Sequence, residues 1–298
     1  MLLSEICKNK DVKCTFVREG EFDAVGLIGL RKNESEKHIA YLLDIKYLEG
    51  AIKDGMDCLI VPAEIVDEVK SSFEGGICTA GNPKESFFLI HNLITENKTF
   101  DENDIDETAI IAETAIIPDK GIKIGANTVI EDYVVLKNHV EIGDNCRIMS
   151  GCVIGTPAYY YFGEGENADM VNSSGYVKIG NHVIIHSNST VCRGVIGGPT
   201  LIGDNTSLDS NVFFAHDVQV GANCTFAAGC VLGGWAEAGD DCYFGLGVTV
   251  APIVRVNDKA KCSIGAVLTK DVPKGTQYSG NFAIEHGKFI QNLKESMK

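Results

Sequence analysis

The sequence has no long apolar run, no two cysteines in a C-x-x-C spacing and comparatively few basic residues. A membrane-spanning helix needs roughly 18 uninterrupted apolar residues, and no stretch of this chain approaches that length. The opening residues MLLSEICKNK lack the basic segment and apolar core of a secretory signal. We therefore expect a cytoplasmic protein without a transmembrane segment.

The charge balance excludes another class of partner. The chain has 26 Lys and Arg against 41 Asp and Glu, a formal net charge of −15. Binding to nucleic acid depends on clustered Lys and Arg, so no nucleic-acid partner is expected. From Arg255 to Lys298, however, eight basic residues stand against four acidic ones, which is +4 there and −19 on the rest. This basic end either attracts an anionic partner or is a solvated tail.

A period of six residues dominates the second part of the chain. Aliphatic or aromatic anchors recur at this spacing in four runs: Ile105, Ile111, Ile117; Ile124, Ile130, Leu136, Ile142, Ile148, Ile154; Ile179, Ile185, Val191; and Ile202, Leu208, Phe214, Val220, Phe226, Leu232, Ala238, Phe244, Val250, Val256, Cys262, Leu268. Neither an amphipathic helix nor an alternating strand has this period. Three strands and three corners per turn, stacked about 4.8 Å apart, form a triangular prism, and 24 anchors correspond to about eight coils.

A second inward position lies four residues after each anchor and holds a small or β-branched residue. Five of the eleven cysteines occupy it: Cys146, Cys152, Cys224, Cys230 and Cys242. Cysteine behaves there as a small hydrophobe, so we interpret these residues as core rather than as disulfides or metal ligands. Gly, Asn and Asp lie near the anchors, as corners with a positive φ require.

The flanking regions lack this period. Residues 1–99 are expected to form an α/β domain, with a helix beginning at the N-cap Asn82 and Pro83. Residues 100–272 form the prism, and residues 273–298 a short helical tail that closes its open end. A 24-residue excursion, residues 155–178, interrupts the prism, and a loop of that length is typically functional or disordered.

This order of parts resembles the hexapeptide-repeat acyltransferases, above all the UDP-3-O-acylglucosamine N-acyltransferases and related enzymes that acylate nucleotide-linked amino sugars. The similarity covers nearly the whole chain and is carried by the repeat, by LDSNVFFAHDVQVG in the prism and by IAYLLDIKYLEGA in the first domain. It implies a left-handed parallel β-helix, which spacing alone does not show, because about 98% of parallel crossovers are right-handed. It also implies a homotrimer that serves cell-surface polysaccharide or lipopolysaccharide synthesis, with acyl-CoA or acyl carrier protein as co-substrate and no permanently bound cofactor.

The resemblance also places the site residues. It puts the general base at His216, its orienting carboxylate at Asp209 and the oxyanion-stabilising backbone N–H at Gly234. Histidine suits the task because an amino sugar arrives as an ammonium ion and must lose a proton near neutral pH. The uracil-binding residues correspond to Tyr41, Asp44 and Tyr47.

Two further groups are expected to bind substrate. Trp235 would line the acceptor or acyl pocket, and Arg255, Lys259 and Lys261 at the basic end would attract the anionic acyl donor. The residues alone leave structural alternatives open: a plain corner for Asp209, a turn for Gly234, and packing for the two tyrosines.

Three other functions are possible on the same fold. The nearest is a sugar O-acetyltransferase. A zinc carbonic anhydrase needs three convergent histidines, but His182, His186 and His216 occupy three different phases of the hexad, so no metal is expected. The third is a non-catalytic binding module, against which the His216 segment and the excursion argue.

Overall fold

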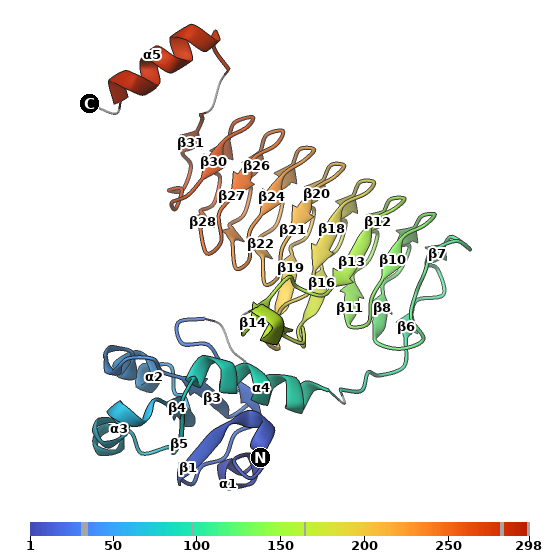
Figure 1. Ribbon diagram of the computed structural model, residues 1–298. Coiled ribbons are helices and arrows are strands. Elements are labelled where there is room, and N and C mark those ends of the chain that lie inside the picture. Colours follow the sequence, from blue (N-terminus) through green and yellow to red (C-terminus); the bar gives the residue numbers. More distant parts are fainter. Residues whose placement is uncertain (31–34, 97, 164, 281–282, 297–298) are drawn as a thin grey trace.

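The computed structural model describes residues 1–30, 35–96, 98–163, 165–280 and 283–296. It contains a small α/β domain, a long prism of stacked coils and a separate C-terminal helix (Figure 1). Within these residues no helix is both long and apolar enough to cross a membrane.

The N-terminal domain is built on one five-stranded sheet with the order β1-β5-β4-β3-β2. Its strands are β1 (Cys14–Arg18), β2 (Ala24–Val25), β3 (His38–Tyr41), β4 (Cys58–Val61) and β5 (Gly76–Ala80). All neighbours are parallel except β1, which is antiparallel to β5. The helices are α1 (Leu3–Ile6), α2 (Leu48–Lys53), α3 (Val66–Ser72) and α4 (Pro83–Thr95).

Successive strand residues enter two different cores, one on each face of the sheet. In β4, Cys58 and Ile60 pack with residues of α1 and α4, whereas Leu59 and Val61 pack with residues of α2 and α3. The predicted start of the helix at Asn82 is confirmed, because its side chain accepts a hydrogen bond from the Glu85 backbone N–H at 3.2 Å.

The prism consists of three parallel sheets. The seven-stranded sheet contains β10 (Val135–Leu136), β13 (Val153–Thr156), β18 (Thr190–Cys192), β21 (Phe213–Phe214), β24 (Val231–Leu232), β27 (Thr249–Val250) and β30 (Val267–Leu268). The eight-stranded sheet contains β6 (Asp104–Ile105), β8 (Ile122–Ile124), β11 (Val140–Ile142), β16 (Tyr176–Ile179), β19 (Pro199–Ile202), β22 (Gln219–Val220), β25 (Glu237–Ala238) and β28 (Arg255–Val256). The nine-stranded sheet contains β7 (Ile110–Ile111), β9 (Val129–Ile130), β12 (Arg147–Ile148), β17 (Ile184–Ile185), β20 (Ser207–Leu208), β23 (Thr225–Phe226), β26 (Tyr243–Phe244), β29 (Lys261–Cys262) and β31 (Gln277–Tyr278).

The predicted anchors form one continuous core. All twelve from Ile202 to Leu268 are buried, whereas Ile105 is 37% exposed because it lies in the first coil, at the end of the stack. Phe226 stacks on Phe244 with 4.4 Å between ring centroids, and loss of such a buried ring typically costs about 3–5 kcal/mol.

The repeat cysteines are core residues, as predicted. Cys146, Cys152, Cys224, Cys230 and Cys242 are all buried and unpaired. Burial raises the pKa of the Cys230 thiol to about 11, so this side chain is an uncharged thiol at neutral pH. The corners also follow the expectation, since Asn205, Asn211 and Asn223 all have φ between 57° and 59°.

The C-terminal helix α5 (His286–Ser296) was predicted to close the open end of the prism, but it does not. It buries none of its residues, and Phe289 and Leu293 are 52% and 45% exposed. Figure 1 shows it apart from the last coil. Phe289 and Leu293 are therefore not covered by the part of the chain that the structure describes.

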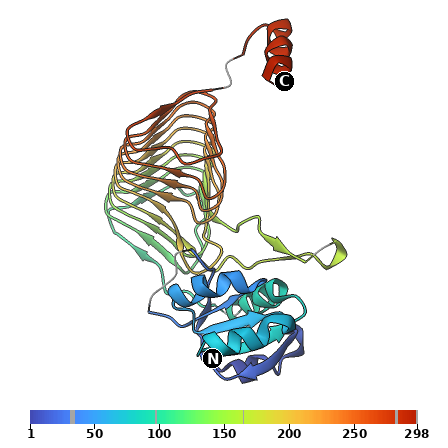
Figure 2. The ribbon, with the colours of Figure 1, turned by 90° about the vertical axis from the view of Figure 1, so that its left-hand side faces the viewer.

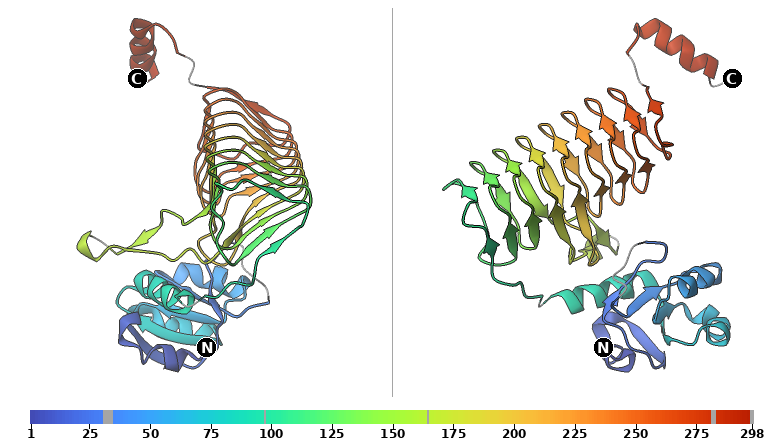
Figure 3. Two further views of the ribbon diagram at one scale, coloured as in Figure 1. Left: turned by 90° about the vertical axis from the view of Figure 1, so that its right-hand side faces the viewer. Right: turned by 180° about the vertical axis from the view of Figure 1, so that it is seen from behind.

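The excursion between β13 and β16 leaves the prism as an arm. Its strands β14 (Tyr161–Phe162) and β15 (Asp169–Met170) form a short antiparallel pair. The arm extends from the coils beside the N-terminal domain (Figures 2 and 3). It packs along α4, where the Asn172 backbone N–H donates to Asn92 Oδ1 at 2.8 Å.

Candidate active site at one edge of the prism

The excursion and the predicted catalytic residues lie on the same edge of the prism. This edge, which we call the catalytic edge, consists of the corners that lead from the seven-stranded to the eight-stranded sheet. Because β21 pairs with β24 in register, the corner containing His216 lies directly against the corner containing Gly234. The excursion emerges from a corner of the same edge, after β13.

His216 is held by the residue that follows it. Its ring Nδ1 lies 3.0 Å from Asp217 Oδ2, and its side chain is 11% exposed. The Asp217 carboxylate also accepts from the Val195 backbone N–H at 2.9 Å, while the Asp217 N–H donates to Thr200 Oγ1 at 2.8 Å. Because a carboxylate can only accept, Nδ1 carries the proton and Nε2 is left with a lone pair that can accept one.

Asp209 was predicted to orient His216, but the carboxylate that contacts the His216 ring is that of Asp217. Asp209 is exposed at the corner after β20, where its Oδ1 accepts from the Ser210 N–H at 2.7 Å. A separation of seven residues exceeds one hexad, so Asp209 and His216 fall on different edges. The signal missed in the sequence is the adjacent aspartate at a corner, where Asp217 has φ of 59° and directs its side chain back to the histidine ring.

Gly234 lies against the imidazole of His216. A Cβ added at this position would lie 2.5 Å from His216 Cε1 and 2.6 Å from Nε2, closer than atoms can approach. Only glycine therefore lets the ring occupy this place. In the described part of the chain the Gly234 N–H donates to no protein acceptor, so it is available to a substrate oxygen.

Aromatic side chains enclose the His216 ring. The Trp235 ring meets it edge to face at 4.4 Å between centroids, and Tyr160 of the excursion does so at 5.6 Å. Burial and the charge of Asp217 raise the pKa of Tyr160, so its phenol stays protonated. Trp235, which was predicted to line the acceptor or acyl pocket, lies against the His216 ring, and its role as a pocket residue stays a prediction.

The same tyrosine connects the site to the N-terminal domain. Tyr160 packs on Phe88 of α4 with 5.5 Å between centroids, and Phe87 next to it contacts Tyr41 at 5.1 Å. The excursion, whose role was left open by the sequence, thus brings α4 to the catalytic edge.

The predicted uracil-binding residues lie around the end of β3. Tyr41 is half-buried against Phe87, and burial raises its pKa. Asp44 caps the short helix η2 (Ile45–Tyr47) by accepting from the Lys46 N–H at 3.0 Å. Tyr47 is 50% exposed with Lys46 Nζ 5.0 Å from its ring centroid. These positions leave the Tyr47 ring available to a ligand, whereas Tyr41 already has a packing partner.

The predicted donor-binding residues are not brought to His216 as a group. Arg255 forms an ion pair with Glu237, and both line a shallow pocket of about 330 Å³ on the eight-stranded sheet. Lys259 is exposed at the next corner, and Lys261 is exposed on strand β29 of the nine-stranded sheet. Of these three residues, only Arg255 therefore lies on a sheet that borders the catalytic edge.

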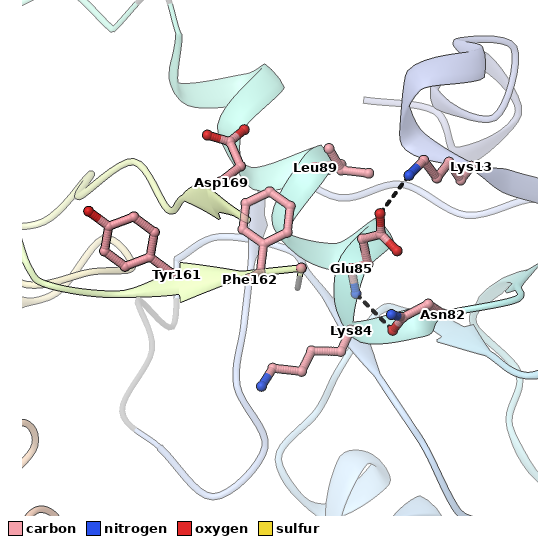
Figure 4. Close-up of a pocket in the computed structure, with 9 residues that line it drawn as sticks. Lys13, Asn82, Lys84, Glu85, Leu89, Tyr161, Phe162 and Asp169 are labelled. Atoms are coloured by element: carbon pink, nitrogen blue, oxygen red, sulfur yellow. Dashed lines mark hydrogen bonds and ion pairs between the residues drawn. The ribbon is translucent and has the colours of Figure 1, made fainter. Parts of the chain in front are cut away.

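A second pocket, of about 790 Å³, lies between α4 and the excursion (Figure 4). Lys13 and Glu85 form an ion pair in its wall, and Tyr161 and Asp169 line it from the excursion. None of the predicted catalytic residues lines it, so the catalytic groups rather than this pocket locate the site. Among the described residues, no group of three or more His, Cys, Asp or Glu side chains is arranged to hold a metal ion.

Comparison with known proteins agrees with this fold and repeat. The family described as bacterial transferase hexapeptide (six repeats) matches two segments, residues 121–156 and residues 199–234. The UDP-N-acetylglucosamine acyltransferase of Campylobacter jejuni has a TM-score of 0.50 at 23% identity, covering 65% of this chain and 83% of its own. That of Francisella novicida has a TM-score of 0.50 at 25% identity, covering 64% and 71%. The chain therefore contains hexapeptide repeats of this kind and has the left-handed β-helix fold, as predicted.

Curated relatives specify the resemblance further. The UDP-3-O-acylglucosamine N-acyltransferase of Herminiimonas arsenicoxydans is 26% identical over 90% of this chain and 85% of its own length. That of Shewanella denitrificans is 31% identical over 51% of this chain and 45% of its own. In four of the curated relatives with this name, including that of Shewanella denitrificans, the match spans about half of the relative's own length. The predicted resemblance to this group of acyltransferases is confirmed.

Proposed function

We propose that the protein is an N-acyltransferase that moves an acyl group from a thioester to the amine of a nucleotide-linked amino sugar. The observation that carries the proposal is the His216–Asp217 pair, whose Nε2 lies beside the backbone of Gly234. The names of the relatives support the class of acceptor. The donor would be acyl-CoA or acyl carrier protein, and the product would serve cell-surface polysaccharide or lipopolysaccharide synthesis.

The chemistry follows from these groups. Nε2 of His216 removes a proton from the amine as the nitrogen lone pair attacks the thioester carbon. The Gly234 N–H would donate to the oxyanion that develops on the former carbonyl oxygen. Collapse of the tetrahedral intermediate breaks the carbon–sulfur bond, and the imidazolium returns its proton to the leaving thiolate. Asp217 stabilises the imidazolium in between.

Product analysis tests the proposal. The purified protein would be incubated with a panel of nucleotide-linked amino sugars and acyl-CoA or acyl carrier protein, and the products analysed by mass spectrometry and alkaline treatment. An alkali-stable amide is expected. An alkali-labile ester would favour the sugar O-acetyltransferase alternative, and the absence of any acylated product would contradict the proposal.

We further propose that Tyr47 stacks on the base of the acceptor. Tyr47→Ala should raise the acceptor KM about tenfold or more, since base–aromatic stacking is worth roughly 1–3 kcal/mol, and leave the donor KM unchanged. Because Tyr47 is half exposed, this variant should fold normally. Leu43→Ala, at an exposed position nearby, is the control. An unchanged acceptor KM in the Tyr47 variant would exclude this role.

The outer face of the seven-stranded sheet supports the predicted homotrimer. Its outward positions carry no charge: Val135, Val153, Thr190, Phe213, Val231, Thr249 and Val267. The outward positions of the eight-stranded sheet, by contrast, include Lys123, Glu141 and Arg255. An uncharged face beside the catalytic edge suits an interface around a threefold axis.

Sedimentation tests the trimer. A mass of about three times 32.1 kDa is expected for the native chain. Phe213→Glu, which places a charge on the uncharged face, should lower both mass and turnover, whereas Thr225→Glu on the nine-stranded sheet should not. A single-chain mass with full activity would contradict the trimer. Docking of the donor at Lys259 and Lys261 stays a prediction, which the donor KM of charge-reversal variants would test.

A further inference from the structure

Three basic residues, Lys98, His139 and Arg193, lie where the excursion leaves and rejoins the prism. None of them is among the residues assigned to catalysis. Lys98, which follows α4, donates from Nζ to the Ser174 carbonyl oxygen at 2.6 Å. His139, on the catalytic edge, has its Nδ1 3.2 Å from the carbonyl oxygen of the next residue, Gly175. Lys98 and His139 therefore approach neighbouring peptide groups from the N-terminal domain and from the prism.

Arg193 joins them from the following coil. Its Nε donates to the Gly155 carbonyl oxygen at 2.8 Å, at the other end of the excursion. The next residue, Gly194, accepts at its carbonyl from the Gly175 N–H at 3.1 Å. The backbone thus brings Arg193 beside the peptide groups that Lys98 and His139 contact.

The two cations have hydrogen-bond donors to spare. An ammonium has three N–H groups and a guanidinium five, and each uses one here. Within the described residues neither Lys98 nor Arg193 forms an ion pair. Arg193 is partly buried and Lys98 lies at the surface. Loss of hydration lowers the pKa of both, the charge of Arg193 lowers that of Lys98 further, and the charge of Glu36 raises it. Cations in such surroundings are stabilised by an anion that accepts their remaining hydrogen bonds.

His139 adds neither a charge nor a free donor, because the single N–H of its neutral ring, on Nδ1, is directed at the Gly175 carbonyl oxygen. Burial and the charge of Lys98 lower its pKa to about 4, so its imidazole is neutral at pH 7. Its ring is enclosed by Tyr176 at 4.9 Å and Phe100 at 5.6 Å between centroids. The positive charge at this place is therefore that of Lys98 and Arg193 alone.

Arg193 lies one coil from the candidate base. The strand before Arg193, β18, pairs directly with β21, which precedes His216. Gly194 is so close to the site that an added Cβ would lie 2.8 Å from Asp217 Oδ1. A ligand at His216 with a charged group about one coil spacing away, roughly 5 Å, would reach Arg193, and a second charged group about one coil farther would reach Lys98.

We propose that Lys98 and Arg193 form a phosphate-binding site that holds the phosphates of a substrate whose reacting end lies at His216. Binding of phosphate there depends only on the two cations, whereas its role as part of an acyl-transfer site rests on the proposed function. Two substrates bring phosphates: the nucleotide-linked acceptor through its diphosphate, and coenzyme A through its own phosphates.

Titration calorimetry on the full-length protein tests the site and distinguishes the sources. UDP is compared with uridine, and coenzyme A with pantetheine, which lacks phosphate. In one of these pairs the phosphorylated member should bind at least about tenfold more tightly, because charge-assisted hydrogen bonds are among the strongest in proteins. The pair that shows the preference identifies the substrate.

Variants show whether the preference belongs to these side chains. Arg193→Gln and Lys98→Met should each remove most of it, and Arg193→Lys should retain part. Lys120→Met, at an exposed lysine paired with Glu102, is the control and should retain all of it. If the two side chains only hold the excursion in place, their loss would weaken UDP and uridine equally.

Two results would overturn the proposal: no preference for the phosphorylated member of either pair in the native protein, or a preference that survives both variants. A protein that acylates none of the amino sugars tested but keeps an Arg193-dependent phosphate preference would contradict the proposed function and leave the phosphate site standing.

Discussion

Replacing His216 by alanine should lower kcat at least about a hundredfold, the scale on which general-base catalysis contributes. The substitution removes the group whose Nε2 accepts the amine proton, and it leaves the Asp217 carboxylate without its imidazole partner. Steady-state kinetics with the preferred acceptor and donor measures the effect, and circular dichroism checks that the prism still folds.

Two variants accompany this measurement. His186→Ala removes an exposed histidine at another corner and should leave kcat unchanged. Asp217→Asn keeps the size of the side chain but lets the amide donate to Nδ1, which moves the ring proton to Nε2 and should also lower kcat markedly. Near-normal turnover of His216→Ala would exclude this histidine as the base.

Gly234→Ala is expected to have an effect of similar size on turnover. The new methyl group would lie 2.5 Å from His216 Cε1, so the imidazole must move away from the backbone N–H that would receive the oxyanion. A displacement of about 1 Å in a catalytic group can cost about a hundredfold in rate. The loss should therefore appear in kcat, measured at saturating acceptor and donor.

A glycine outside the site provides the matched control. A Cβ at Gly81 in the N-terminal domain meets no atom within 4 Å, so Gly81→Ala should keep full activity. If Gly234→Ala turned over normally, the His216 ring would not work from the position that it occupies here.

The prism was the part of the fold that the sequence specified best. A period of six determines which residues face inward, and the buried row from Ile202 to Leu268 follows from it directly. The left hand does not follow from spacing, because a right-handed coil would bury the same residues; the resemblance supplied it. The tail was mispredicted because the end of the repeat shows where the prism stops, but not what the helix that follows packs against.

The site was only partly predictable. His216, Gly234 and Trp235 come together because residues 18 or 19 apart lie on adjacent coils at the same edge. Asp217 was missed because the resemblance placed the orienting carboxylate at Asp209, seven residues before His216, whereas the left-handed corner folds the adjacent side chain back onto the ring.

The contribution of the excursion could not be predicted either. Tyr160 reaches His216 only because the arm docks on α4, where it is held by contacts more than 70 residues apart in sequence, such as that of Phe88 with Tyr160. No periodic pattern connects these segments. The same holds for Lys98 and Arg193, which come from different parts of the chain.

A structure of the native protein with a bound acceptor tests the central claim most directly. The acceptor would be the nucleotide-linked amino sugar that yields most product in the panel, soaked or co-crystallised without donor. We expect its amine nitrogen at about 2.6–3.2 Å from His216 Nε2, the distance at which a base can take a proton. An amine bound elsewhere, for example in the pocket between α4 and the excursion, with His216 out of reach, would contradict the assignment of His216 as the base.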